Sequence, residues 1–120
     1  MANPIRSAMD RGVVCTMHND APILGPDPFI ILWAAVNRRS INTGTLFGEE
    51  ERISVREGIR ALTINGAYQS FDEDRKGSIE PGKLADLVVI NLDPLSLDPM
   101  DIKEIRVLET IKDGVTVYTA

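Results

Sequence analysis

The chain has 120 residues, 43% hydrophobic and 26% charged, a composition typical of one soluble globular unit and not of a disordered or membrane-spanning chain. Its 18 acidic and 13 basic side chains give a net charge of −5, and residues 61–120 carry the whole acidic excess. Because no stripe of Lys and Arg is present, we expect neither nucleic-acid binding nor attachment to an anionic membrane.

Two single residues set further limits. Cys15 is the only cysteine and cannot close an intramolecular disulfide, so we predict a reducing, cytoplasmic location. His18 is the only histidine, which excludes a histidine-rich metal centre within one copy of this chain. The longest apolar run, residues 29–36, is far shorter than the roughly 20 residues that cross a bilayer.

The first half of the chain predicts two helices separated by a strand. Residues 4–11 favour a short helix, and residues 13–17 are a short apolar run rich in β-branched side chains, which predicts a buried strand. Asp27 followed by Pro28 is typical of a helix start, because Asp accepts bonds from free N–H groups and Pro tolerates the first helical position. The helix over residues 28–39 is apolar on nearly every side and therefore needs covering.

The middle of the chain predicts a second long helix. Three consecutive acids at residues 49–51 indicate a solvated loop or first turn. Ser54 and Glu57 then have the spacing of a capping box, in which each side chain satisfies a backbone donor near the other residue. We expect the helix that starts there to run to Tyr68 or Ser70.

The last third predicts strands. Residues 86–90 and 105–112 have the composition of strands, and Asp98 before Pro99 predicts a short helical turn between them. Asp113 and Gly114 predict a tight hairpin turn into a final strand that ends near Thr119, since both positions of a type I′ turn need positive φ. The order of elements predicts a mixed α/β fold.

The candidate site is the loop at residues 18–22, directly after the predicted strand at 13–17. Functional side chains in α/β folds gather at the carboxyl ends of strands. Asp20 can bind a divalent metal or act as a general base, and His18 can bind a substrate group or relay a proton. The alternative is that Asp20 accepts hydrogen bonds from turn amides and His18 is an exposed loop residue.

The stretch KGSIEPGKLADLVVI at residues 76–90 resembles the closing signature of the amidohydrolase superfamily, in its family 3 branch of metal-dependent hydrolases. Residues 53–68 resemble the helix that precedes this signature, and residues 18–22 with Asp27 and Pro28 resemble the segment around the eighth strand of the catalytic barrel. The resemblance covers essentially the whole chain, as the C-terminal piece of a longer enzyme.

The resemblance implies a (β/α)8 barrel plus a β-sandwich, of which this chain is an incomplete part. Residues 1–70 would be the barrel-derived segment, with the last strand and helices, and residues 71–120 would supply sandwich strands. Asp20 matches the aspartate that handles the proton of the attacking water and contacts the metal, with His18 as a substrate-binding residue. Asn19 stands where the family commonly has Ser, which leaves the substrate contacts open.

The reaction implied is hydrolysis of amide or related C–N bonds in a small-molecule substrate, with a divalent metal, zinc, in the intact enzyme. The family's metal-binding histidines lie on earlier strands, so we expect no metal on this chain alone. Three hypotheses follow: a fragment or subunit of such an enzyme that is inactive alone, a non-catalytic module for oligomerisation or partner binding, or a free-standing hydrolase built on His18 and Asp20, for which no second base or nucleophile is evident. Because strand edges would lack neighbours, we expect a homo-oligomer or a complex with the missing barrel segment.

Overall fold

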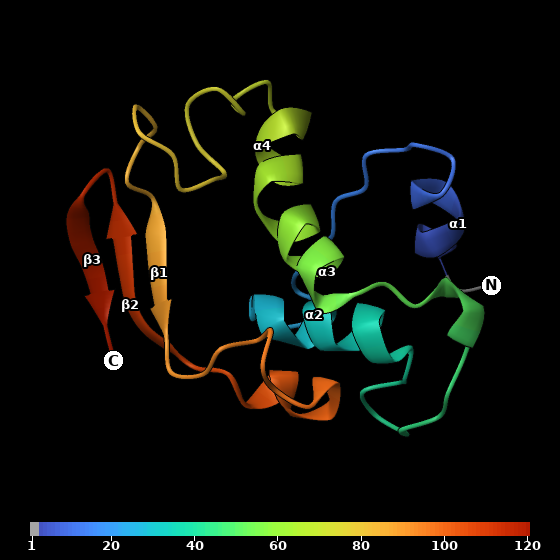
Figure 1. Cartoon of the computed structure of the whole chain (residues 1–120). Helices are drawn as coiled ribbons and strands as arrows, with labels where there is room; N and C mark the ends of the chain where they lie inside the picture. The colour runs from blue at the N-terminus through green and yellow to red at the C-terminus, as the bar shows by residue number, and fades with distance from the viewer. Residues whose placement is uncertain (1–2) are drawn as a thin grey trace.

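The computed structural model describes residues 3–120, with helices on one side and a small sheet on the other (Figure 1). The elements along the chain are α1 (Ile5–Met9), α2 (Pro28–Asn37), the 3-10 helix η1 (Glu49–Glu51), α3 (Val55–Leu62), α4 (Ile64–Gln69), β1 (Leu87–Ile90), the 3-10 helix η2 (Pro99–Glu104), β2 (Val107–Lys112) and β3 (Val115–Thr119). They form the mixed α/β fold that the sequence predicts. None of the helices within residues 3–120 is long and apolar enough to cross a membrane.

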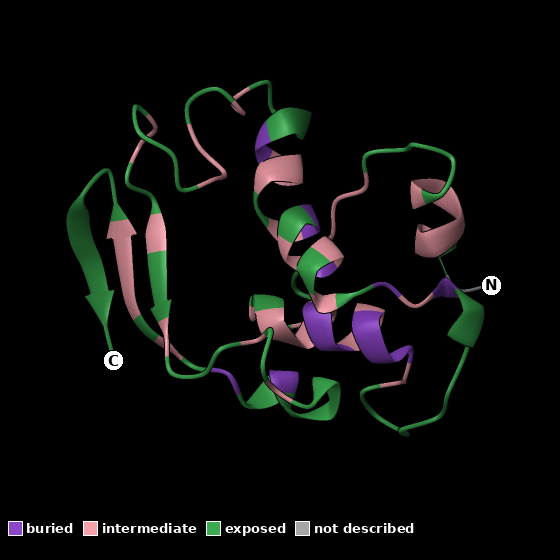
Figure 2. Ribbon diagram, viewed as in Figure 1, coloured by how far each residue is buried: buried purple, intermediate pink, exposed green. Residues whose placement is uncertain are grey.

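The core lies where α2 meets η2 and α3. The Asp27 side chain accepts a hydrogen bond from the Phe29 N–H (2.9 Å) and so begins α2 as predicted. From α2, Leu32 and Trp33 are buried, and Ile102 of η2 packs with them (Figure 2). The apolar helix therefore obtains much of its covering from η2, a segment about 70 residues further along the chain.

The polar end of α2 completes this contact. Arg38 adopts a left-handed conformation (φ 52°), so α2 ends at Asn37, two residues before the predicted end at Arg39. The Asn37 side chain donates to the carbonyl oxygen of Pro99 (2.8 Å), and the Trp33 indole donates to that of Met100 (3.0 Å). These bonds fix η2 against α2 by polar as well as apolar contacts.

The predicted capping box is confirmed, but the predicted long helix is two helices. The Ser54 hydroxyl accepts from the Glu57 N–H, and the Glu57 carboxylate accepts from the Ser54 N–H (2.8 Å). The helical conformation is interrupted at Thr63 (φ −121°, ψ −94°), which separates α3 from α4. The Thr63 hydroxyl donates to the carbonyl oxygen of Ile59 (2.8 Å), a local bond of the kind that bends helices.

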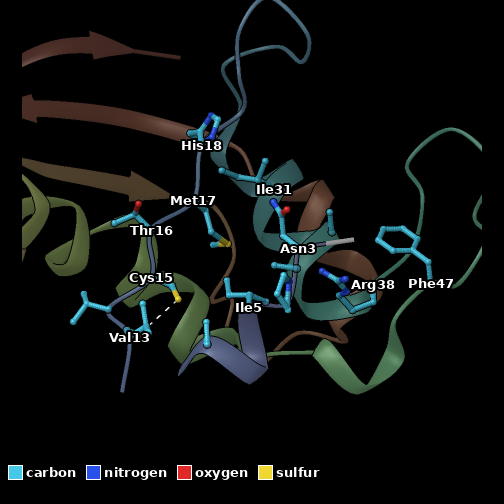
Figure 3. A pocket seen from close by; sticks show the side chains of 15 residues that line it. Asn3, Ile5, Val13, Cys15, Thr16, Met17, His18, Ile31, Arg38 and Phe47 are labelled. Atoms are coloured by element: carbon cyan, nitrogen blue, oxygen red, sulfur yellow. Dashed lines mark hydrogen bonds between the residues drawn. The ribbon is translucent and has the colours of Figure 1, made fainter. Parts of the chain in front are cut away.

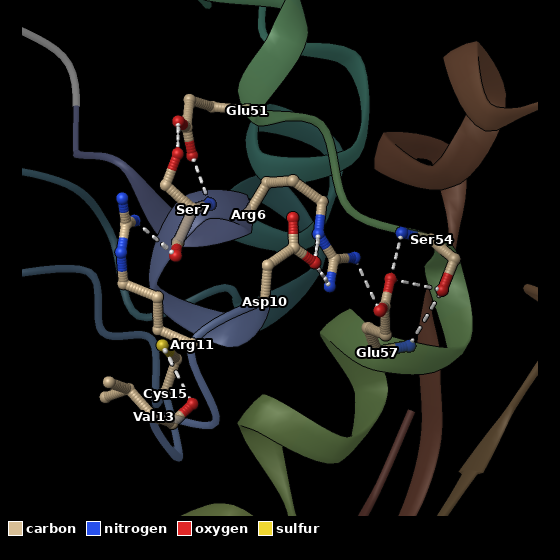
Figure 4. Close-up of polar contacts among 9 residues, drawn as sticks. All are labelled: Arg6, Ser7, Asp10, Arg11, Val13, Cys15, Glu51, Ser54 and Glu57. Atoms are coloured by element: carbon tan, nitrogen blue, oxygen red, sulfur yellow. Dashed lines mark hydrogen bonds and ion pairs between the residues drawn. The ribbon is translucent and has the colours of Figure 1, made fainter.

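The prediction that the acidic run at residues 49–51 is solvated is wrong for Glu51. Its side chain is buried and accepts hydrogen bonds from both the backbone N–H and the hydroxyl of Ser7 in α1 (Figure 4). The Ser7 hydroxyl, followed by its N–H, lowers the pKa of Glu51. Since Pro4 offers α1 no side-chain cap, Glu51 supplies the acceptor that the free N–H groups of its first turn need.

The three strands form one antiparallel sheet in the order β1–β2–β3. The hairpin turn is the predicted one, with positive φ at Asp113 (49°) and Gly114 (77°). Exposed apolar side chains remain on the sheet, among them Val88, Leu108 and Val117. Residues 3–120 do not form the second layer that a sandwich requires.

The predicted strand at residues 13–17 is absent. The segment runs between α1 and the loop before α2 without regular structure (Figure 1). Within residues 3–120, no backbone N–H from Val14 to Asn19 donates to a backbone carbonyl, whereas the Cys15 carbonyl accepts from the Asn65 side chain (2.9 Å). The prediction was wrong because a strand needs a neighbouring strand, and the described chain offers none beside this run.

Candidate functional site

The loop at residues 18–22 follows the unpaired segment and leads toward α2. Asp20 is exposed and has a left-handed backbone (φ 54°), a conformation in which Asp is enriched among non-glycine residues. Its carbonyl oxygen accepts from the Ile23 N–H (2.9 Å), which closes a turn. Within the described residues, the Asp20 carboxylate itself has no hydrogen-bond partner. The turn is therefore held by the Asp20 backbone and not by its side chain.

Asn19 anchors the loop. Its side-chain Nδ2 donates to the carbonyl oxygens of Gly25 (2.5 Å) and Asp27 (3.0 Å), so it ties the loop to the residue that caps α2. Its Oδ1 is buried and has no partner among the described residues. The sequence identified Asn19 only as a departure from Ser and did not predict this positioning role. Hydrogen bonds from a side chain to backbone carbonyls six to eight residues away leave no signal in the sequence.

His18 lies beside Asp20 in this loop. The His18 Nδ1 accepts a hydrogen bond from the Asp20 N–H (3.1 Å), so in the neutral ring Nε2 carries the proton. The structure thus brings the two predicted site residues together through the backbone. It leaves one carboxylate and one imidazole nitrogen available for contacts outside the loop.

The described residues do not fit a complete metal site. Across residues 3–120, no three His, Cys, Asp or Glu side chains come together in a way that could hold a metal ion. His18 and Asp20 offer two donor groups, whereas a catalytic zinc normally takes three protein ligands. Any metal at this loop would need ligands from another segment.

A groove of about 540 Å³ lies beside this loop, between α1 and α2. We call it the α1–α2 groove; residues 13–18 form one wall, and Ile31, Ala34 and Arg38 belong to the α2 side (Figure 3). His18 lies at one end of the groove, and Arg38 and Phe47 lie together away from it. Most of its lining is apolar, so the unpaired segment borders an open apolar surface.

The model of the amidohydrolase family matches residues 1–118. The chain belongs to this family. It is 36% identical over 115 residues to N-substituted formamide deformylase of Arthrobacter pascens, a match that covers 96% of this chain and 21% of that protein. It is 30% identical over 115 residues to the putative amidohydrolase YtcJ of Bacillus subtilis, covering 94% of this chain and 22% of that protein.

A solved structure gives the same result in three dimensions. The amidohydrolase from Thermotoga maritima matches with a TM-score of 0.66 and 31% identity, over 97% of this chain and 26% of that structure. The chain therefore spans about a fifth of the length of the curated relatives cited above. The resemblance carried by residues 76–90 is confirmed at the level of the family and of a partial amidohydrolase fold.

Proposed function

We propose that this chain supplies the aspartate-bearing loop of a metal-dependent hydrolase that acts on amide or related C–N bonds in a small-molecule substrate. Asp20 accepts the proton of the attacking water, and His18 contacts the substrate. A zinc or other divalent metal would be held mainly by residues of a separate barrel segment, and Asp20 would be the one contact from this chain. Without that segment the chain is inactive.

The observation that carries the proposal is the unoccupied carboxylate of Asp20 in a loop that Asn19 holds in place. A general base must reach the proton it removes, and a side chain already engaged in the turn could not do so. Fixing the loop through Asn19 reduces the motion of that carboxylate. The substrate class is supported by the name of one relative, the N-substituted formamide deformylase, since a formamide contains an amide C–N bond.

A chimera tests this function. The matched segment of the Arthrobacter pascens deformylase is replaced by this whole chain, so that the rest of the barrel is present. We expect the chimera to hydrolyse an N-substituted formamide, and Asp20→Asn to lower kcat by roughly 10²–10⁴-fold, the usual contribution of a general base. Asp74→Asn, at an exposed carboxylate far from the loop in sequence, is the matched control and should leave kcat unchanged.

Two results would contradict the proposal. The first is a folded chimera, by circular dichroism, that has no activity above the chain alone. The second is an active chimera in which Asp20→Asn and Asp74→Asn give the same kcat.

The alternative, a non-catalytic module that forms a homo-oligomer, is favoured by β3. Every residue of this edge strand is exposed and none is charged. Uncharged edges of this kind pair with other strands. Light scattering at micromolar concentration distinguishes the readings: a dimer that Val117→Lys dissociates, together with an inactive chimera, would favour the module.

A further inference from the structure

The imidazole ring of His18 is held by the backbone of its own loop. Its Nδ1 accepts a hydrogen bond from the Asp20 N–H (3.1 Å). The residues around this N–H are themselves held in place. The Asn19 side chain donates to the carbonyl oxygen of Asp27 (3.0 Å), and the Asp20 carbonyl oxygen accepts from the Ile23 N–H (2.9 Å). The loop therefore keeps an N–H group directed at one nitrogen of the ring.

This hydrogen bond decides which ring nitrogen carries the proton. A neutral imidazole has one donor and one acceptor nitrogen, and the bond that one nitrogen makes sets the state of the other. With Nδ1 as the acceptor, the proton is on Nε2. The opposite tautomer would place Nδ1–H against the Asp20 N–H, so two donors would face each other. Within residues 3–120, Nε2 donates no hydrogen bond, and the ring is exposed, so this N–H is available to a molecule outside the chain.

The same bond is the reverse of the one that a metal-binding histidine makes. Such a histidine binds the ion through the lone pair of one ring nitrogen and donates the N–H of the other to a carboxylate, carbonyl or water. In His18 the lone pair of the neutral ring already faces the Asp20 N–H. His18 therefore presents a proton, and not a lone pair, to its surroundings.

A hydrogen-bond donor beside Asp20 has a specific use in amide hydrolysis. When water attacks the carbonyl carbon, the π electrons of the C=O bond move onto the carbonyl oxygen, and the base takes a proton from the water. The oxygen gains negative charge in this step, and a donor that is already in position stabilises it. Asp20 offers the carboxylate and His18 the N–H, and the turn holds both in one loop.

We propose that His18 is a catalytic residue that donates an Nε2–H hydrogen bond to the oxygen of the scissile carbonyl, with its tautomer fixed by the Asp20 backbone N–H. His18 keeps its proton throughout, while Asp20 receives the proton of the water. The inference rests on the proposed function, because it assigns the contact that His18 makes there. It also narrows the substrate class, since the group beside His18 must be an acceptor oxygen.

Amide hydrogen exchange of the whole chain tests the bond that sets the tautomer. The Asp20 amide should exchange roughly tenfold faster in His18→Ala, which removes its acceptor. His18→Asn should retain the slow exchange, because an Asn side-chain oxygen accepts from the N–H two residues further along the chain. The Ile23 amide, which donates to the Asp20 carbonyl oxygen, is the internal control and should change little in either variant.

The deformylase chimera then tests the donor with two matched variants. His18→Asn keeps the loop contact but has no donor at the position of Nε2, and it should lower kcat by roughly 10²–10³-fold, the usual cost of losing one donor to the developing oxyanion. KM should change by less than about threefold, because this bond strengthens in the transition state. His18→Gln restores an N–H near that position and should keep kcat within about tenfold of the unaltered chimera.

The metal content of the three chimeras separates a donor from a metal ligand. Elemental analysis should give the same divalent metal content for the unaltered chimera, His18→Asn and His18→Gln. A content that falls in both variants would overturn the inference, because His18 would then be a ligand.

Two further results would overturn the inference. One is an Asp20 amide that exchanges equally fast in the unaltered chain and in His18→Ala. The other is a His18→Asn chimera with unaltered kcat; if Asp20→Asn still lowers kcat, the proposed function stands and the role of His18 alone fails. A folded chimera without activity would instead contradict the proposed function, and the role of His18 with it.

Discussion

Strand β2 and the segment at residues 13–17 are alike in sequence and different in structure. Both are short, rich in β-branched and aliphatic side chains, and bounded by turns. β2 lies between β1 and β3, which pair with it on both edges, whereas residues 13–17 have no strand beside them in the described chain. The difference shows that local composition specifies the tendency to extend, and that neighbouring backbone decides whether a strand forms.

β2 and residues 13–17 differ because the neighbouring strands of β2 lie close to it in the sequence. β1, β2 and β3 all lie within residues 87–119, so the sheet assembles from one short stretch. Residues 13–17 are preceded by α1 and followed by further helices, and none of these can serve as a neighbouring strand. This behaviour agrees with a chain that matches 26% of a larger solved amidohydrolase structure.

Proline scanning should give the largest contrast between the two regions. Thr110→Pro, in the central strand, removes a ladder N–H and should lower the free energy of unfolding by about 3 kcal/mol or more. Val14→Pro removes an N–H that has no backbone partner and should cost less than about 1 kcal/mol. Urea unfolding of the two variants makes the measurement. Equal losses would mean that residues 13–17 are paired after all.

Two glycines in the helical half should give the next largest difference. A Cβ at Gly58 would lie 2.3 Å from Leu32 Cδ1 in the core, so Gly58→Ala should destabilise by about 1–3 kcal/mol through overpacking. Gly66 has open space around the same position, and Gly66→Ala should stabilise by up to about 1 kcal/mol through helix propensity. Thermal melts that move both variants in the same direction would show that α3 does not pack on α2 this closely.

The smallest effect concerns the polar tether between α1 and α3. The Arg6 guanidinium, followed by Ser54, lowers the pKa of Glu57 from its ordinary 4.5 to about 2 (Figure 4). The charged carboxylate therefore stabilises the fold at neutral pH, and this contribution is lost as the pH falls from about 4.5 toward 2.

Glu57→Gln should lower stability by about 1 kcal/mol at pH 7 and by much less near pH 2, since Glu57 is partly exposed. Denaturant unfolding as a function of pH measures this, with Glu50→Gln at an exposed carboxylate as the control. A difference between Glu57→Gln and the unaltered chain that stays constant from pH 7 to pH 2 would contradict the tether.

Features that depend on neighbouring residues were predictable from the sequence. The Asp27 cap, the Ser54–Glu57 capping box and the turn at Asp113 and Gly114 all involve groups within three residues of one another, and all three are confirmed. The position of the loop at His18 and Asp20 was also predictable, because its motif carried the family resemblance.

Features that depend on distant contacts were not predictable. The burial of Glu51 requires Ser7, which lies 44 residues away, and the position of Arg38 at the edge of the groove depends on how α1 lies beside α2. An arginine directly after an apolar helix is a weak hint of such a position. For the same reason the segment at residues 13–17 was predicted as a strand, since its sequence does not reveal that its neighbours are missing.

Amide hydrogen exchange of the isolated chain tests the central claim most directly. We predict that the amides of Val14, Thr16 and Met17 exchange almost as fast as in an unfolded peptide, while those of β2 exchange slower by roughly two orders of magnitude or more. Protection at residues 14–17 equal to that of β2 in the monomeric chain would contradict the account, because this segment would then have its strand partners within the chain itself.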